Sequence, residues 1–540
     1  MIITQKKPID EVMAMVADAK TVAIVGCGSC ATACQTGGEP QIAELTAILE
    51  QAGKKVVATT VADYCCMNLG VKTKMKAINA AEPDCVICMS CGDGVQFTLS
   101  SLVYETMYVL DETFTPHPQL VERAEYDAET YTYTLYVRDG VRFSDGVVMT
   151  AQDVADSLRR AMVSPRYGTR LLQVEKVSVD GDTVVVKLLE DNRAFIALLD
   201  IPVVQSGTEE ERIPIGTGPY VPSEDLSLLL PNSAWWQNTT LPFTEIHLLP
   251  YKSEEAAAYA FSSNDVHLFV YDLLNDANVL SASDDSSIGV DTAVMHYLAF
   301  NFQREQLSAP ALRRGVSLAI DRDTVVSACL AGHAAAAQFP INPASPLYPT
   351  HLETDTSSAA VQKALTELSL TDGEETHKLR LLVNSENSFK VAAAENIALT
   401  LNRYDFEVTV EVLDWEDYLY AISVGDYDLY YGECKLGSDW DLTALLSVEG
   451  ILNYGGYVNP ETDALLLEAK RAESSARSDA LEALYRHLQE LAPIVPLGFK
   501  QEDLLLPQGA VEAVTPTAAN PFYGLEHWQV HWGEGADTAE

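Results

Sequence analysis

Cysteines are concentrated at the front of this 540-residue chain, where eight of the ten fall within the first 91 residues. Three of them, Cys27, Cys30 and Cys34, have the spacing CxxCxxxC, and Cys66 and Cys91 follow further along. Three thiolates from one loop and helix start, with a fourth from Cys91 or Cys66, would complete the ligands of an iron-sulfur cluster (4Fe-4S) or of a closed zinc site. A group of reduced cysteines without a metal is the alternative.

The elements that must position these cysteines are strands and helices that alternate along the front of the chain. Hydrophobic runs predict strands at residues 21–26, 56–58 and 85–89, and helical spacing predicts helices at residues 39–52 and 72–81. Such alternation, with short glycine turns, predicts a small parallel α/β sheet. Because ligands collect at the carboxyl ends of parallel strands, the cysteines that follow these strands can converge on one point.

Two strings carry a family resemblance for this part of the chain. VGCGSCATACQTGG (residues 25–38) and MSCGDGVQ (residues 89–96), with a cysteine after the second strand, resemble the methylene-tetrahydrofolate reductase C-terminal-like (MetV-type) domain. The resemblance covers residues 1–97 and implies a Rossmann-like cysteine-rich domain that holds an iron-sulfur cluster or zinc on the five cysteines named above. It also implies a flavin-dependent methylenetetrahydrofolate reductase as a partner.

The rest of the chain differs sharply in charge. Residues 1–97 hold eight Lys and ten Asp or Glu, a net charge of −2, whereas the whole chain carries −43. So large a negative charge argues against nucleic acid and anionic membrane surfaces as partners. An apolar fraction of 47% predicts a folded chain, and no apolar run reaches the ~18 residues of a membrane-spanning helix.

The first residues do not resemble an export signal. Asp10, Glu11, Asp18 and Lys20 interrupt the stretch that would have to be an apolar core of about 7–15 residues. We therefore expect the protein in the cytoplasm. In that reducing compartment clustered cysteines act as metal ligands or redox groups and do not form a disulfide framework.

A second diagnostic stretch is YTYTLYVRDGVRFSDGVVMTAQDVADSL, residues 131–158. Its alternation predicts a strand, a turn at Asp139 and a return strand at residues 141–143. Thr150 then predicts a helix N-terminus, with Asp153 in the position of a capping box. The stretches that follow show no nucleophile–base spacing, no metal-ligand spacing and no nucleotide-binding loop, so we expect no enzymatic activity from this part of the chain, while an accessory electron-transfer role stays open for the N-terminal part.

Further strings follow this stretch in a fixed order: GTGPY (216–220), YLAFNF (297–302), LRRGVSLAIDR (312–322) and APIVPLGF (492–499). Together with it they resemble the family 5 (oligopeptide, dipeptide and nickel) solute-binding proteins of ABC importers. The resemblance implies two α/β lobes of the periplasmic-binding-protein-like fold (type II, cluster C), joined by crossing strands, which close on a small peptide-like solute. It also implies ABC permease subunits as partners and, for the family, export and a lipid anchor.

The resemblances predict how the chain is divided. The cysteine-rich domain takes residues 1–97, the first lobe takes residues 98–291 plus 495–535, the second lobe takes residues 292–494, and residues 536–540 form a tail. We favour a solute-binding protein fused to the cysteine-rich domain. The alternatives are a cytosolic redox accessory protein of the reductase and a non-functional chimera of the two.

The second resemblance also points to ligand-binding residues. Peptide binders of this class often pair the peptide ammonium with an acidic residue near the segment GSDWD (437–441), which offers Asp439 and Asp441. Four tryptophans could form the pocket wall and two residues of the predicted crossing strand could face it; these are Trp235, Trp236, Trp415, Trp440, Tyr297 and Asn301. The alternatives are carboxylates of a solvated loop and ordinary core aromatics.

Overall fold

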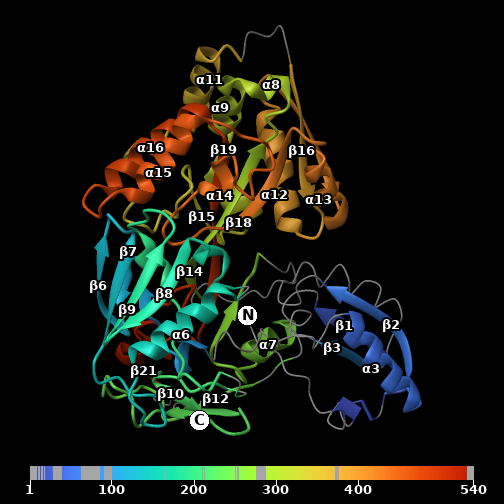
Figure 1. The fold of residues 1–540 in the computed structure, drawn as a ribbon. Coiled ribbons are helices and arrows are strands. Elements are labelled where there is room, and N and C mark those ends of the chain that lie inside the picture. Colours follow the sequence, from blue (N-terminus) through green and yellow to red (C-terminus); the bar gives the residue numbers. More distant parts are fainter. Residues whose placement is uncertain are drawn as a thin grey trace, which may run out of the picture.

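The computed structural model shows a small N-terminal sheet beside two larger lobes, which lie one above the other in Figure 1. It describes the chain apart from residues 1–8, 10–11, 14–15, 18, 28–38, 63–84, 90–99, 165, 210, 212, 250, 252–253, 275–286, 371–375 and 532–540. Among the helices in the described ranges, none combines the length and the apolar character that crossing a lipid bilayer requires.

The N-terminal part is a parallel sheet with strand order β2-β1-β3. Its elements are β1 (Thr21–Cys27), α3 (Glu39–Gln51), β2 (Lys55–Ala62) and β3 (Cys85–Met89). Leu45 and Leu49 of α3 are buried in one cluster with Val22 of the central strand. The predicted parallel sheet and the helix at 39–52 are confirmed, and the helix predicted at 72–81 lies outside the described residues. That this part is a Rossmann-like cysteine-rich domain stays a prediction.

The lower lobe is built on an antiparallel sheet, β6-β7-β9-β8, against which helix α6 packs. These elements are β6 (Val121–Asp127), β7 (Thr132–Val137), α6 (Ala151–Met162), β8 (Val174–Asp180) and β9 (Thr183–Leu188). Helix α6 begins as predicted, since the Thr150 N–H donates to Asp153 Oδ2 at 2.8 Å in a complete capping box. The return strand predicted at 141–143 is wrong, because the chain turns back so soon that only an isolated bridge, Arg142 with Val148, forms.

Smaller elements complete the lower lobe. They are β4 (Tyr108–Leu110), β5 (Pro116–Pro118), η1 (Thr169–Leu171), η2 (Phe195–Leu198), β10 (Tyr220–Pro222), β11 (Leu228–Pro231), β12 (Ile246–His247), α7 (Glu254–Ser262), β20 (Val511–Glu512), η6 (Leu525–His527) and β21 (Gln529–Val530).

The GTGPY turn packs against the chain around Val103. A Cβ on Gly216 would lie 2.1 Å from the Val103 carbonyl oxygen, so only glycine allows this close approach.

The upper lobe surrounds a mixed sheet with the order β13-β19-β14-β18-β16-β17, in which β15 also pairs with β19. Its strands are β13 (Phe269–Tyr271), β14 (Ser287–Phe300), β15 (Ala334–Ala336), β16 (His377–Asn384), β17 (Phe406–Leu413), β18 (Leu429–Lys435) and β19 (Ile494–Leu505). Its helices are α8 (Glu305–Ser308), α9 (Pro310–Ala319), α10 (Arg322–Thr324), η4 (Val325–Cys329), η5 (Thr350–Leu352), α11 (Ser358–Glu367), α12 (Ser388–Leu401), α13 (Trp415–Ser423), α14 (Thr443–Leu446), α15 (Pro460–Arg471) and α16 (Arg477–Leu491).

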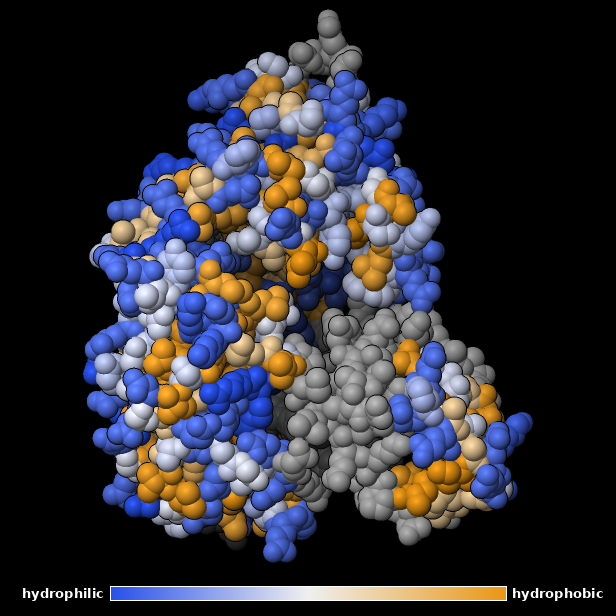
Figure 2. All heavy atoms as spheres, in the orientation of Figure 1, coloured by the Kyte–Doolittle hydropathy of each residue, from blue (hydrophilic) through white to orange (hydrophobic). Residues whose placement is uncertain are grey.

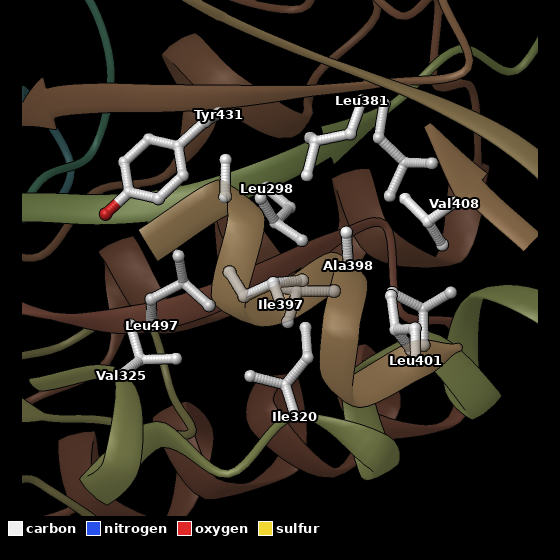
Figure 3. Packing of buried hydrophobic residues seen from close by; sticks show 14 of the residues in the cluster. Leu298, Ile320, Val325, Leu381, Ile397, Ala398, Leu401, Val408, Tyr431 and Leu497 are labelled. Atoms are coloured by element: carbon white, nitrogen blue, oxygen red, sulfur yellow. The ribbon is translucent and has the colours of Figure 1, made fainter. Parts of the chain in front are cut away.

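Two hydrophobic clusters hold the upper lobe together, one on each face of this sheet. In the first, Figure 3 shows Ile397 and Leu401 of α12 packed among Leu298 of β14 and Leu381 of β16. The second contains buried side chains of α13, α15 and α16. Each fully buried leucine or isoleucine contributes about 2 kcal/mol to the free energy of unfolding, so these faces make the lobe a stable support for the strands.

Strands β14 and β19 connect the two lobes. They pair antiparallel along most of their length. Near the start of β14, Val290 is buried with Leu504 and Leu506 in a cluster that includes Val511 of the lower lobe. Toward its end, β14 pairs with β18 in the upper lobe. The predicted architecture of two lobes joined by crossing strands is what the structure has, while the predicted lobe boundaries stay a prediction.

Candidate functional site

A cleft of about 1670 Å³ lies where the two lobes meet, and Figure 2 shows the surface hollowed between them. The lower wall includes Glu105, Arg170 and Trp236, and the upper wall includes Lys435. Strand β14 contributes Asp291, so the crossing strands form part of the cleft surface. Both lobes and their connection therefore meet at this one space.

Trp235 and Trp236 line the lower wall and are held by one carboxylate. The indole Nε1 of Trp235 lies 3.2 Å and that of Trp236 2.6 Å from the Glu105 carboxylate, which also accepts from Gln237 Nε2 at 3.2 Å. Glu105 is 4% exposed, and its burial raises the pKa of the carboxyl to about 7, although these donors act in the opposite direction. The two rings are thus fixed by a buried acid.

The local sequence explains why the two tryptophans reach this wall together. Strand β11 ends at Pro231, and the next residue, Asn232, forms an Asx turn in which the Ala234 N–H donates to Asn232 Oδ1 at 2.9 Å. The Asn232 Nδ2 donates to the Gly218 carbonyl at 2.8 Å and so ties the turn to the GTGPY segment. Trp235 and Trp236 follow directly, so one anchored turn presents both rings.

Asp439 and Asp441, the predicted ammonium ligands, lie on the upper wall of the cleft. Lys470 Nζ is 3.0 Å from Asp441 Oδ2, and the Thr443 N–H donates to Asp441 Oδ1 at 2.9 Å. Burial, together with the charge of Asp441, raises the pKa of Asp439. Burial also acts to raise the pKa of Asp441, but the Lys470 charge and the hydrogen bonds from Thr443 and Lys470 together outweigh it and lower that pKa. Asp441 is therefore already paired with a cation of the chain.

The two acids also belong to a junction between the lobes. Lys470 Nζ lies 2.6 Å from Glu190 Oε1 of the lower lobe. Asn192, in the same lower-lobe loop, donates from Nδ2 to Asp439 Oδ2 at 3.3 Å. The GSDWD segment therefore makes polar contacts with the opposite lobe in addition to lining the cleft.

The other two predicted wall tryptophans lie outside the cleft. Trp440 is 3% exposed, and its ring meets Phe114 edge-on with 5.2 Å between centroids and Phe499 at 6.0 Å. Trp415 begins α13 and stacks on Tyr418 at 5.7 Å. Trp440 belongs to the buried hydrophobic cluster of the upper lobe, and Trp415 is half-buried against the edge of the same cluster, so the structure places neither ring at the predicted pocket wall.

Tyr297 and Asn301, predicted to face the cleft, also lie in the interior of the upper lobe. Side chains alternate along β14, and Tyr297 falls on the face that packs into the cluster with α13 and α16. Asn301 follows the last residue of β14, and its Nδ2 donates to the carbonyls of Gly425 at 2.9 Å and Tyr427 at 3.0 Å. Asn301 thus closes a turn in the upper lobe, away from the cleft.

Sequence reasoning missed most of the charged residues of the cleft, which include Glu105, Arg166, Arg170, Asp291 and Lys435. Asp291 accepts from Gln501 Nε2 at 3.1 Å, and burial raises the pKa of its carboxyl. The composition held one signal for the cations among them. The chain has only 35 Lys and Arg against 78 Asp and Glu, so each Lys or Arg is a candidate for a specific structural or binding role.

Of the predicted metal ligands, the structure describes the backbone of Cys27, which is the last residue of β1. Cys30, Cys34, Cys66 and Cys91 lie outside the described residues. Within the described ranges, no group of three or more His, Cys, Asp and Glu side chains is placed to hold a metal ion. The predicted iron-sulfur or zinc site therefore stays a prediction.

Comparison with known sequences identifies relatives for most of the chain. The family model for bacterial extracellular solute-binding proteins, family 5 Middle, matches residues 115–447. Oligopeptide-binding protein AppA of Bacillus subtilis is 20% identical over 490 residues, which are 83% of this chain and 90% of AppA. Periplasmic murein peptide-binding protein MppA of Escherichia coli is 25% identical over 418 residues, 69% of this chain and 77% of MppA.

Solved structures share the two-lobed fold. The unliganded open form of the MppA murein tripeptide binding protein aligns with a TM-score of 0.69 at 19% identity, covering 81% of this chain and 93% of that chain. A nickel ABC transporter protein from Bacillus halodurans aligns with a TM-score of 0.67 at 20% identity, covering 78% and 92%. The predicted periplasmic-binding-protein-like fold is confirmed, whereas residues 1–97 lie outside the matched family range and their resemblance stays a prediction.

Proposed function

Because the chain belongs to family 5 of the bacterial extracellular solute-binding proteins, we propose that it binds a peptide-like solute between its lobes and delivers it to the permease subunits of an ABC importer. Its relatives are binding proteins and not enzymes. The family is one of extracellular proteins, so the predicted cytoplasmic location gains no support from it.

The cleft between the lobes is the observation that carries this proposal. Its volume of about 1670 Å³ exceeds the roughly 1,000 Å³ at the upper end of ordinary small-molecule pockets, which favours an extended solute such as a peptide. The indoles of Trp235 and Trp236 offer flat apolar surface for side chains or for the peptide backbone. Such a wall needs little rearrangement to accept a ligand, because Glu105 already fixes both rings.

The acidic pole of such a solute site is best placed on the crossing strand. Asp441 is neutralised by Lys470. Asp439 lies close to Arg477, and the positive charge of this guanidinium weakens the attraction of Asp439 for a ligand cation. Asp291 accepts a hydrogen bond from the neutral Gln501 side chain and lines the same cleft. We therefore assign the ammonium of a peptide to Asp291, with the originally predicted pair Asp439 and Asp441 as the alternative.

Calorimetry with purified protein tests the proposal. Titration with a mixed tripeptide pool is expected to release heat and to raise the melting temperature, whereas a mixture of free amino acids is not. Nickel with histidine serves as the competing ligand class, since one of the structural relatives is a nickel transporter protein. Binding of the nickel mixture alone, with no response to peptides, would replace the peptide assignment by a metal-chelate one.

For the N-terminal part we propose a separate thiolate metal site, with an iron-sulfur cluster or zinc as its occupant. The observation that favours it is the parallel pairing of β1 with β2 and β3, because three parallel strands bring their carboxyl ends to one edge. Cys27 is the last residue of β1, Cys66 follows β2 by four positions and Cys91 follows β3 by two.

Anaerobic purification tests this second site. A brown protein with iron and sulfide would establish the cluster, and a colourless protein with one equivalent of zinc would establish the zinc form. A metal-free protein after reconstitution would leave reduced cysteines only. It would also remove the basis for a redox partnership with a flavin-dependent methylenetetrahydrofolate reductase.

A further inference from the structure

Phe114 has a backbone conformation that bulky residues rarely adopt. It lies in the turn between β4 and β5 of the lower lobe, and its φ is +63°. In this left-handed region the Cβ of an L-residue crowds the following carbonyl oxygen, so glycine or asparagine is the usual occupant. A bulky residue remains in such a conformation only where the surrounding contacts compensate for the strain.

The turn itself supplies part of this compensation. The Phe114 N–H donates to the Asp111 carbonyl at 3.0 Å. The Asp111 carboxylate accepts from the Thr113 N–H at 2.8 Å and from the Thr115 N–H at 3.0 Å. His117 Nε2 lies 2.7 Å from the other carboxylate oxygen of Asp111. Because hydrogen bonds fix the backbone on both sides of Phe114, the turn sets the direction of its ring.

The Phe114 ring extends from the lower lobe and packs against the upper one. Its centroid lies 5.2 Å from that of Trp440, and the two rings meet edge-on at 75°. An edge-to-face pair of this kind is favourable beyond the area that it buries. Phe114 also lines the cleft, so this contact lies at the boundary between the lobes.

Trp440, the partner in this contact, also has a left-handed backbone. Its φ is +53°, and its N–H donates to the Gly437 carbonyl at 2.9 Å. Trp440 is 3% exposed, whereas the residues on either side of it, Asp439 and Asp441, line the cleft. The orientation of the Trp440 ring therefore influences how this turn presents two carboxylates to the cleft.

The carboxylates on either side of Trp440 are held by polar groups, whereas its ring has aromatic neighbours. Phe499, at 6.0 Å, belongs to β19 in the upper lobe. Phe114 is nearer and comes from the lower lobe. Loss of the Phe114 ring would leave the polar contacts in place and would remove an aromatic contact that connects this turn to the lower lobe.

We propose that Phe114 is a positioning residue for the ligand site: its ring holds Trp440 and thereby orders the upper wall of the cleft at Asp439 and Asp441. This inference rests on the proposed function and adds a lower-lobe residue that orders the wall of the upper lobe. A wall that is ordered before the ligand arrives loses less conformational entropy on binding. Loss of the ring should therefore weaken binding while the protein stays folded.

Phe114→Gly tests the proposal, because glycine removes the ring and tolerates the same backbone conformation. Relief of the strain offsets the loss of the ring contact, so the melting temperature should stay within about 5 °C of the wild-type value. Binding of the tripeptide pool, measured by calorimetry, should weaken by about tenfold. Should Phe114→Gly fail to fold, Phe114→Asn takes its place, since asparagine also tolerates this conformation.

Phe114→Tyr keeps the ring and should bind the pool as the wild type does. Wild-type affinity in Phe114→Gly, or a tenfold loss in Phe114→Tyr as well, would overturn the proposal.

Leu226→Gly is the matched control. Leu226 lies in the turn between β10 and β11 of the lower lobe, its φ is also +63°, and its N–H donates to the Ser223 carbonyl at 3.0 Å. The described residues that line the cleft do not include Leu226. Leu226→Gly should therefore relieve the same backbone strain and keep wild-type affinity. An equal loss of affinity in both glycine variants would assign the effect to turn flexibility and would contradict a role of the ring.

Hydrogen exchange without ligand separates positioning from direct contact with the ligand. The amides of residues 437–443 should exchange about tenfold faster in Phe114→Gly than in Leu226→Gly, because their turn loses its contact with the lower lobe. Unchanged exchange would overturn the positioning role even if binding weakens, since Phe114 would then act by touching the ligand. Should the wild-type protein bind no tripeptide, the proposed function fails, and the exchange rates alone decide whether Phe114 holds the turn.

Discussion

Lys470 of the upper lobe lies with its Nζ 2.6 Å from Oε1 of Glu190 in the lower lobe. The same ammonium lies 3.0 Å from Oδ2 of Asp441, so one lysine serves a cleft-wall acid and the opposite lobe together. Its side chain is only 9% exposed, and an ion pair so protected from water is screened less by salt than a surface pair. Lys470 therefore links the conformation of the GSDWD segment to the contact between the lobes.

Replacing Lys470 by Met should lower the free energy of unfolding by about 2–3 kcal/mol, because Asp441 would remain largely buried without its cation. The value is below that of a fully buried pair, since Glu190 is 45% exposed. Urea denaturation followed by circular dichroism measures it. The matched control is Lys363→Met, whose side chain is 78% exposed and forms only a surface pair with Glu367. Equal free energies of unfolding for both variants would show that the ion pairs of Lys470 do not stabilise the fold.

Glu105 should make the stability of the protein depend on pH. Burial raises the pKa of its carboxyl from 4.5 to about 7 in the folded chain. Between these two pH values the folded state binds a proton that the unfolded state has lost, so the free energy of unfolding falls as pH rises, by roughly 3 kcal/mol in total. Glu105→Gln cannot ionise, and the difference in stability between wild type and variant should follow this slope in urea unfolding at pH 5, 6 and 7.

The indoles of Trp235 and Trp236 report the same ionisation, since both donate to Glu105. Tryptophan emission of the wild-type protein should change between pH 6 and pH 8, and that of Glu105→Gln should not. The remaining four tryptophans are common to both proteins and serve as an internal control. A titration of the same size in both proteins would assign the change to another group.

Features that depend on residues close together in the sequence could be predicted, whereas contacts between residues far apart in the sequence could not. The capping box of Thr150 and Asp153 was predictable because both partners lie within one helical turn. By contrast, Asp439 meets Asn192 across 247 positions of the chain, and no local pattern indicates such a contact. The predicted tryptophans divided in the same way: Trp235 and Trp236 follow a local Asx turn to the cleft, whereas long-range packing against Phe114 and Phe499 takes Trp440 into the core.

This division of the tryptophans predicts different effects on substitution. Trp440→Ala should lower the free energy of unfolding by about 3–5 kcal/mol, the usual cost of removing a buried aromatic side chain. Trp236→Ala should instead weaken binding of the tripeptide pool by about tenfold, since it removes an aromatic ligand surface at the cleft wall. Urea denaturation and calorimetry on both variants separate the two effects. A Trp440→Ala protein with unchanged stability that no longer binds peptides would show that Trp440 contacts the ligand and does not belong to the core.

Gly218 should be essential to the position of the cleft wall. A Cβ at this residue would lie 2.4 Å from the carbonyl oxygen of Leu102, and backbone cannot move aside as a flexible side chain can. Gly218→Ala should therefore lower the free energy of unfolding by about 3 kcal/mol or more. Gly289→Ala is the matched control: Gly289 also lines the cleft, but no heavy atom lies within 4 Å of the added Cβ, so its effect should stay within about 1 kcal/mol.

Gly218→Ala should also disturb the ligand site. The Gly218 N–H donates to the Val103 carbonyl at 2.9 Å, and Val103 lies two positions before Glu105. Displacement of this segment would release the two indoles from their shared carboxylate. The tryptophan emission of the folded variant should then resemble that of Glu105→Gln at every pH. An unchanged wild-type titration in Gly218→Ala would show that the turn and the tryptophan pair are held independently.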